Sequence, residues 1–269
     1  MKSLKEQIDS LISEGYSTDA ARAKVVHDAV LWAMHKSGFK ANSTIKGGVV
    51  MSSLTGDVRR ATMDMDIDFI HYSLAEKSVE RFVAKLAKAI PQLTLKMVGK
   101  PIELKHEDYR GKRIYLMVKD SSIMRAIRTK VDIGVHKREE IEQVEFAFDV
   151  SAENSPAELL ANSPEQIFSE KLLSLLRHGA LSNRPKDVFD MCYLVERLDR
   201  ARLAGYIKAL IYENKRCRVT NHETMMKMLQ AIFSTRTFVG KLKNSRVNWL
   251  EISSDEVITA IVSFLETLN

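Results

Sequence analysis

An alternating run of aspartates and apolar residues constrains the fold of this chain more than any other feature. From Arg60 to Ile70 the sequence reads Arg-Ala-Thr-Met-Asp-Met-Asp-Ile-Asp-Phe-Ile. Alternation with period two predicts an extended strand, with Asp64, Asp66 and Asp68 on one face and their apolar neighbours buried on the other. Carboxylates on one strand face stand about 7 Å apart and repel each other, so folding alone does not favour them. A bound divalent cation such as Mg²⁺ would offset this repulsion. An edge strand with a solvated acidic face is the alternative interpretation.

A pair of glycines precedes this run. Gly47 and Gly48 follow Lys46 and open a short apolar segment that ends at Leu54. Because glycine has no Cβ, backbone N–H groups at a helix N-terminus can approach a phosphate there. A glycine pair alone marks a turn in most proteins. Followed by a short helix and a strand with Asp-x-Asp, it resembles the polymerase-β-like nucleotidyltransferase superfamily. The resemblance implies a mixed sheet with flanking helices.

A later aspartate stands alone among apolar residues. Asp132 lies within the probable strand Ile127–Val135, where an aspartate is costly unless it is paired or bound to a metal ion. It is either a turn residue, an ion-pair partner of Lys130 or His136, or a metal ligand. In the polymerase-β-like arrangement a third carboxylate comes from a later neighbouring strand, and the resemblance implies that Asp132 fills this position.

The hydrophobic periodicity predicts an α+β chain in two parts. A nucleotidyltransferase-like domain of mixed sheet and flanking helices is expected over residues 1–155, and a helical domain that completes the active-site cleft over 156–269. The expected helices are 3–14, 18–37, 75–90, one beginning at Ser163, 185–197, 199–213, 221–233 and 254–267. The expected strands are 60–70, 93–98, 113–118, 125–135 and 145–150, with Gly111 and Lys112 as a turn between two of them.

The helical part carries a second set of charged residues. Lys171 follows Glu170 on one expected helix, and the segment Asn183–Met191 opens another with Pro185. Asp187 and Asp190 lie one helical turn apart, on nearly the same face. Aspartates in a first helical turn are often simply solvated and suit the helix dipole, and this interpretation stays open.

Four ordered motifs sharpen the resemblance: Lys-Gly-Gly, Arg-x-Thr-x-Asp-h-Asp (where h is apolar), Glu-Lys-Leu and Arg-Pro-Lys-Asp-x-x-Asp. Together they resemble the AbiEii/AbiGii family of nucleotidyltransferase-like toxins over about residues 40–195. The resemblance implies transfer of NMP from an NTP to an acceptor hydroxyl, with Mg²⁺ or Mn²⁺ as cofactor. It also implies RNA as acceptor, at the tRNA 3′ end, and a cognate antitoxin in a toxin–antitoxin or phage-defence system.

The family pattern also assigns roles to residues of this sequence. The implied metal ligands are Asp64, Asp66 and Asp132, which are catalytic together with Lys171 and Asp187. The implied nucleotide-binding residues are Lys46, Gly47, Gly48, Ser52, Arg60 and Lys171. Asp68 is an additional carboxylate. The family's usual serine or threonine after the glycines is Val49 here, so hydroxyl contact with phosphate falls to Ser52 or Ser53.

Composition limits the remaining classes of protein. The net charge of +6 is compatible with a polyanionic partner. No long apolar run or secretory leader is visible, so we expect a cytoplasmic protein without a membrane segment, whose Cys192 and Cys217 are reduced and buried. The C-terminal basic residues form either an RNA-binding surface or ordinary solvated helix faces; they are Arg216, Arg218, Arg236, Lys241, Lys243 and Arg246. Rival functions are nucleotide transfer to a small molecule or a protein, a kinase-like toxin, and a non-catalytic nucleotide-binding module.

Overall fold

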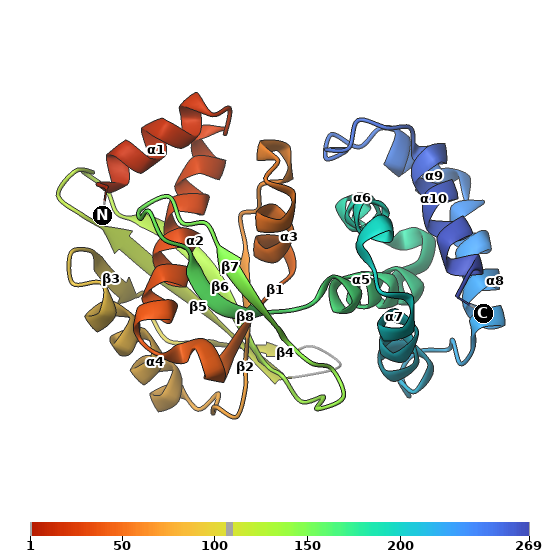
Figure 1. Cartoon of the computed structure of the whole chain (residues 1–269), viewed down its shortest axis with the longest axis horizontal. Coiled ribbons are helices and arrows are strands. Elements are labelled where there is room, and N and C mark those ends of the chain that lie inside the picture. The colour runs from red at the N-terminus through yellow and green to blue at the C-terminus, as the bar shows by residue number, and fades with distance from the viewer. Residues whose placement is uncertain (1, 106–109, 269) are drawn as a thin grey trace. The chain divides into compact units, whose positions relative to one another are not determined.

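The computed structural model describes residues 2–105 and 110–268 (Figure 1). The chain divides into two compact units, Met1–Asn162 and Ser163–Asn269. The helices of the first unit are α1 (Leu4–Ser13), α2 (Thr18–Lys36), α3 (Gly47–Thr55) and α4 (Glu76–Ala89). Its strands are β1 (Ser43–Lys46), β2 (Met65–Phe69), β3 (Thr94–Met97), β4 (Ile102–Lys105), β5 (Arg110–Lys119), β6 (Ile127–Val135), β7 (Val144–Phe148) and β8 (Ala157–Ala161). The second unit has α5 (Pro164–His178), α6 (Pro185–Leu194), α7 (Arg200–Ile207), α8 (His222–Phe233), α9 (Arg236–Lys243) and α10 (Ser254–Glu266).

The strands of the first unit form one mixed sheet within the described residues. Their order is β3-β5-β6-β2-β1-β8-β7, and β4 pairs with the first half of β5. Strand β2 pairs with β6 in parallel, and β1 pairs with β8 in parallel. The other pairs are antiparallel. A mixed sheet with flanking helices, followed by a helical region, confirms the predicted α+β fold.

The core of this unit follows from the period-two pattern of its strands. Helix α2 packs on β6 and β8, and α4 packs on β3 (Figure 1). The buried side chains of the central strands alternate with polar ones, as a half-covered sheet requires. The fully buried apolar side chains include Ile45, Met65, Ile67, Phe69, Ile114, Leu116, Val131 and Ile133. The opposite face of these strands is therefore left to the polar side chains.

The helix starts follow local signals in the sequence. Ser3 and Ser17 cap α1 and α2, and each side-chain oxygen accepts a backbone N–H of the first turn. Ser163 caps α5 in the same way, with Pro164 as the first helical residue. These starts agree with the predicted helices.

Several boundaries differ from the prediction. Strand β2 covers only residues 65–69, because Val58–Arg60 turn as a short 3₁₀ helix instead of extending the strand. The predicted turn at Gly111 and Lys112 is wrong, since both residues lie inside β5 and pair with β4. The two units divide between Asn162 and Ser163, later than the predicted 155, because the unpredicted strand β8 pairs with β1. Helix α9 was also not predicted.

Two expectations from composition can be compared with the structure. Both cysteines are free, as predicted, but they are partly exposed and not buried. Among the described residues, every helix is too short or too polar to cross a lipid bilayer.

Candidate active site

Strands β2 and β6 bring together carboxylates from two distant parts of the chain. The strands are parallel neighbours, and Asp66 stands opposite Asp132 in their register. Adjacent strands lie about 4.8 Å apart, so these two residues are one strand spacing from each other. Met65 and Ile67 are buried in the core, which leaves Asp66 on the opposite face of β2. The two predicted carboxylates thus form one acidic cluster.

Asp64 lies just before β2 and is the most exposed of the three predicted ligands. Its side chain is 57% exposed, and its Oδ1 lies 2.8 Å from the Nζ of Lys130 on β6. Lys130 is therefore the ion-pair partner of Asp64, and not of Asp132 as one alternative held. This pair ties the entry of β2 to β6.

Asp132 has a different basic partner, which the sequence analysis did not single out. The Nε of Arg113, on β5, donates to Asp132 Oδ1 at 2.7 Å, and its Nη2 donates to Oδ2 at 2.8 Å. Arg113 and Asp132 are register partners on antiparallel strands, so the backbone itself sets up this two-pronged contact. The alternation of β5 is the sequence signal for it, because Arg113 falls on the face opposite to Ile114 and Leu116.

The additional carboxylate, Asp68, has a structural partner of its own. Asp68 is 8% exposed, and its Oδ2 lies 2.9 Å from Lys46 Nζ. Strands β1 and β2 run antiparallel, with Lys46 opposite Asp66 and Thr44 opposite Asp68. The side chain of Lys46 thus supplies positive charge beside the aspartates of β2.

Asp66 is the carboxylate of the cluster whose pKa is raised most clearly. Burial raises the pKa of its carboxyl from 3.8 to about 6, and the negative charges of Asp132 and Asp64 act in the same direction. Lys46 and Lys130 oppose this shift in the pKa without cancelling it. Burial and the neighbouring carboxylates thus both disfavour the ionised form of Asp66, and an additional positive charge would favour it.

The glycine pair is in contact with this cluster and with the segment before β2. Gly47 has a left-handed φ of +54°, and a Cβ built on it would lie 3.2 Å from Asp66 Oδ2. A Cβ on Gly48 would lie 2.5 Å from Thr62 Oγ1. Both positions need glycine, one for its conformation and contact with Asp66 and the other for space against Thr62. The Lys-Gly-Gly and Arg-x-Thr-x-Asp motifs are thus packed against each other.

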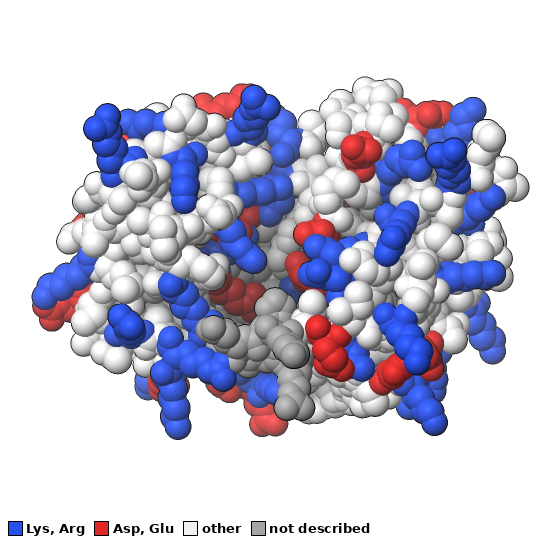
Figure 2. All heavy atoms as spheres, turned by 180° about the vertical axis from the view of Figure 1, so that it is seen from behind, with Lys and Arg blue, Asp and Glu red and all other residues white. Residues whose placement is uncertain are grey.

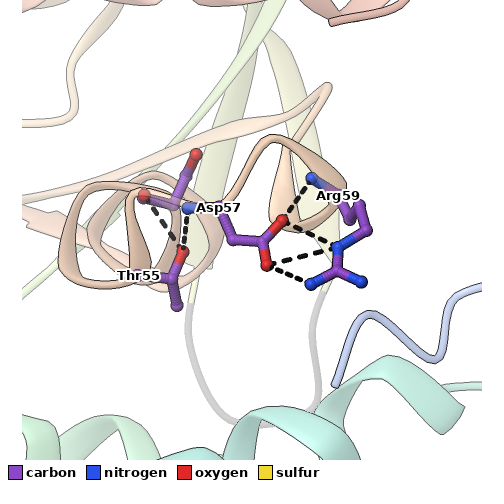
Figure 3. A network of polar contacts seen from close by, with 4 residues as sticks. Thr55, Asp57 and Arg59 are labelled. Atoms are coloured by element: carbon purple, nitrogen blue, oxygen red, sulfur yellow. Dashed lines mark hydrogen bonds and ion pairs between the residues drawn. The ribbon is translucent and has the colours of Figure 1, made fainter. Parts of the chain in front are cut away.

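A short turn joins the glycine helix α3 to the acidic strand (Figure 3). The Asp57 carboxylate accepts hydrogen bonds from the backbone N–H of Arg59 and from its guanidinium, with Nη2 at 2.7 Å. Thr55 Oγ1 in turn accepts the Asp57 N–H. These contacts fix the chain between α3 and β2, so that the two motifs keep a constant spacing.

The chemistry of the donor set fits a divalent cation. Asp64, Asp66 and Asp132 offer the carboxylate oxygens that Mg²⁺ and Mn²⁺ prefer, and a cation beside Asp66 would favour its ionised form. As the side chains lie, no group of three or more His, Cys, Asp or Glu residues in the described part of the chain is arranged to hold a metal ion. In this arrangement Lys130 and Arg113 supply positive charge to Asp64 and Asp132.

Two predicted nucleotide-binding residues lie in less accessible places. Arg60 is only 2% exposed, so its guanidinium is part of the interior. Ser52 lies on α3 and lines a small cavity together with Tyr16, Lys24, His27, Asp28 and Thr62. Neither position adds support for a contact with nucleotide, and both roles stay predictions.

The charged residues of the second unit form a partly buried cluster of their own. The Nζ of Lys171, on α5, lies 2.5 Å from Asp187 Oδ1 and 2.9 Å from Asp190 Oδ2, both on α6. Asp190 is fully buried and accepts a hydrogen bond from Trp249 Nε1 at 3.2 Å. The pairing of Lys171 with Asp187 brings the basic and the acidic motif residue of the second unit into direct contact. The sequence placed Asp190 on nearly the same helix face as Asp187, but its contacts with Lys171 and Trp249 were not predicted.

Comparison with known structures shows the same overall fold. The chain is similar to JHP933 from Helicobacter pylori, with a TM-score of 0.56 and 14% sequence identity over 94% of this chain and 93% of that one. It is also similar to a candidate nucleotidyltransferase from H. pylori, with a TM-score of 0.52 and 14% identity over 92% of each chain. Among curated proteins, no sequence matches the chain.

The family comparison covers most of the chain. The model of the nucleotidyl transferase AbiEii toxin of type IV toxin–antitoxin systems matches residues 29–249. The match includes both glycines, the three carboxylates of the first unit, and the Lys171–Asp187 pair of the second. The chain belongs to the AbiEii family of nucleotidyltransferase toxins.

Proposed function

We propose that this nucleotidyltransferase transfers NMP from an NTP to a hydroxyl of RNA, at the 3′ end of tRNA, and acts as a toxin in the cytoplasm. The observation that carries the proposal is the register pairing of Asp66 with Asp132 beside Gly47. Nucleotidyl transfer places several negative charges in one small site. A cluster of carboxylates next to a glycine turn meets the two needs of that reaction, a cation site and phosphate-binding N–H groups.

Each residue of the cluster has a proposed task. Asp64, Asp66 and Asp132 would hold Mg²⁺ or Mn²⁺. The bound ion would neutralise triphosphate charge and activate the attacking hydroxyl. The N–H groups of Gly47 and Gly48, at the N-terminus of α3, would bind phosphate oxygens. Asp132 would accept the proton of the acceptor hydroxyl as it attacks the α-phosphorus and pyrophosphate leaves.

Basic residues have proposed roles in charge neutralisation. Lys46 lies at the end of β1, directly before the glycines, where its charge adds to that of the helix N-terminus. We propose that Lys171 and Asp187 contribute to catalysis as the family motif implies, with Lys171 binding phosphate. Ser52 and Arg60 remain further candidates for nucleotide contacts. A cognate antitoxin encoded nearby would control the activity.

One labelling experiment tests the proposal. The protein is incubated with each α-³²P-NTP, Mg²⁺ and total RNA, and the products are separated by gel electrophoresis and thin-layer chromatography. Label on RNA of tRNA size, absent in an Asp64→Asn variant, is the expected result. Label on protein or on a small molecule would identify another acceptor and refute the RNA proposal. Absence of label with every nucleotide would favour a non-catalytic nucleotide-binding module.

A further inference from the structure

The face of the sheet that carries the acidic cluster continues into a basic surface along β3, β5 and β6. Strand β5 alternates, so that Ile114, Leu116 and Val118 are buried while Tyr115, Met117 and Lys119 lie on the opposite side. Strand β6 alternates in the same way, with Arg128 and Lys130 on that side. From β3, Lys96 joins them opposite Met117. We call this set the open sheet face; it consists of Lys96, Tyr115, Met117, Lys119, Arg128 and Lys130.

The open sheet face is basic and accessible. Lys96, Lys119 and Arg128 are exposed, and Met117 is 37% exposed. Within the described residues these three basic side chains form no salt bridge, unlike Lys130 and Arg113, which are engaged with the acidic cluster. Lys and Arg side chains are also prominent over the wider surface in Figure 2. A surface with this charge is complementary to a polyanion.

A stacked pair stands in the middle of the face. The guanidinium carbon of Arg128 lies 4.0 Å from the centre of the Tyr115 ring. The two residues are diagonal neighbours, because Tyr115 is opposite Lys130 and Arg128 is opposite Met117. Arginine planes and aromatic rings are the surfaces on which unpaired nucleobases stack in proteins that bind single strands. Charge alone would suit any polyanion, whereas a flat stacked pair suits one with exposed bases.

The stacked pair is close to the acidic cluster on the same strand. Arg128 precedes Asp132 by four residues, which is about 13 Å along β6. Lys130 lies between them, on the same face. A short single strand lying along β6 can therefore place its last nucleotides on the stacked pair and its terminal hydroxyl at the carboxylates.

We propose that the open sheet face binds the unpaired 3′ end of the acceptor RNA. Bases stack on Arg128 and Tyr115, and phosphates pair with Lys96 and Lys119. The inference rests on the proposed function for the identity of the acceptor, but it makes a separate claim about where the strand binds. Binding to this face is expected without NTP and without transfer.

Equilibrium binding tests the claim independently of catalysis. The full chain and its variants are titrated into a fluorescein-labelled 12-nucleotide single-stranded RNA, and anisotropy is recorded without NTP. Arg128→Ala and Tyr115→Leu should each weaken binding about 10- to 100-fold, while Tyr115→Phe keeps the ring and should bind as the wild type does. Lys96→Gln with Lys119→Gln should lower the slope of log K against log salt by about 0.7 for each phosphate that the protein no longer neutralises.

Matched variants identify the competing outcome. Arg218→Ala and Arg236→Ala remove exposed charge from the second unit and should leave binding unchanged. If these two weaken binding and Arg128→Ala and Tyr115→Leu do not, the RNA surface lies on the helical unit and the proposal is wrong. Thermal melting followed by circular dichroism checks that each variant is folded. Because Arg128 is exposed, Arg128→Ala should melt at the same temperature as the wild type. If Arg128→Ala melts at a lower temperature, Arg128→Gln is used in its place.

The outcomes separate this inference from the proposed function. Asp64→Asn should lose transfer but retain RNA binding, because Asp64 is not part of the open sheet face. If the wild type labels RNA but Arg128→Ala and Tyr115→Leu bind and label it normally, only the inference fails. If the wild type labels no RNA in the presence of NTP and Mg²⁺, the proposed function fails, while the binding titration still decides whether the face takes a single strand.

Discussion

Asp66 and Asp132 are register partners on two adjacent parallel strands, although they are far apart in the sequence. Burial is the main cause of the raised pKa of Asp66, and the negative charge of Asp132 adds to it. Around them, Arg113 and Lys130 each hold one carboxylate of the cluster. Positive and negative side chains thus alternate in the cluster, so a substitution of one of them changes the electrostatic environment of its neighbours.

The first prediction separates the proposed ligands from the additional aspartate. Asp64→Asn should lower nucleotide transfer at least about 100-fold with little change in folding, because Asp64 is exposed and its charge would serve catalysis. Asp68→Asn should lower stability, because its pair with Lys46 is broken, and reduce transfer much less. Transfer is measured with α-³²P-NTP and stability by urea unfolding. Equal loss of transfer in both variants would contradict the assignment.

Arg113 should compete with divalent cations for Asp132. Arg113→Gln removes a positive charge from both oxygens of that carboxylate, so Mn²⁺ should bind about 10-fold more tightly or better. Titration of free Mn²⁺ by electron paramagnetic resonance reports the affinity without any catalytic step. Arg81→Gln, which removes an arginine hydrogen-bonded to Ser78 Oγ on α4, is the control. Unchanged Mn²⁺ affinity in Arg113→Gln would show that Asp132 is not a ligand.

Gly47 and Gly56 provide a matched pair of left-handed glycines. Their φ values are +54° and +61°, but only Gly47 has a neighbour, Asp66, near the missing Cβ. Both alanine variants should lose about 1 kcal/mol or slightly more of unfolding free energy from backbone strain. Gly47→Ala should in addition lose transfer, because Asp66 must shift. Urea unfolding measures the loss of stability, and the labelling assay measures the loss of transfer. Full activity of Gly47→Ala would show that close contact between residue 47 and Asp66 is not needed for transfer.

Lys171 should matter for stability as well as for any catalytic role. Lys171→Met leaves Asp190 buried without its cation, and breaking a buried ion pair from one side costs about 3–5 kcal/mol. Lys227→Met removes a lysine from an exposed pair with Glu223 and should change the unfolding free energy very little. Urea unfolding of the two variants measures the difference. If Lys171→Met is as stable as Lys227→Met, the cluster of the second unit is not held by this lysine.

The buried His27 predicts a loss of stability in acid. Burial lowers the pKa of its imidazole from 6.5 to about 4, and its Nε2 has no hydrogen-bond partner in the described residues. Because the folded pKa lies below the unfolded one, the unfolded chain binds the proton first as pH falls. The stabilisation is complete above about pH 6.5 and decreases toward pH 4, by about 2–3 kcal/mol in total.

Comparison with a variant isolates this contribution. His27→Gln should show a smaller loss of unfolding free energy between pH 7 and 4.5 than the wild type. Asp66 contributes with the opposite sign in the same range, since its folded pKa is raised, but it does so in both chains and cancels in the difference. Parallel pH profiles for the two chains would rule out a neutral buried His27.

Local signals in the sequence predicted much of the first unit. The alternation of β2 gave the face of Asp66, and Ser163 marked the start of α5. The pairing of β1 with β8 was not predicted, because Ala157–Ala161 carries only a short apolar pattern that does not show its distant partner. Arg113 was missed for the same reason, since its role depends on the register between β5 and β6. Asp190 and Trp249 meet only through the tertiary packing of the second unit.

The shared register of β2 and β6 also determines where the chain can tolerate inserted or deleted residues. Inserting one residue within Met65–Phe69 would exchange the two sides of the strand, placing Asp66 among core side chains and an apolar neighbour among charges. The connection after Lys119, which joins β5 to β6, lies outside this register, and its contacts with the start of α1 come from Asp120 and Ser122. Natural length variation in relatives of this chain should therefore concentrate in such connections and be absent from the two acidic strands.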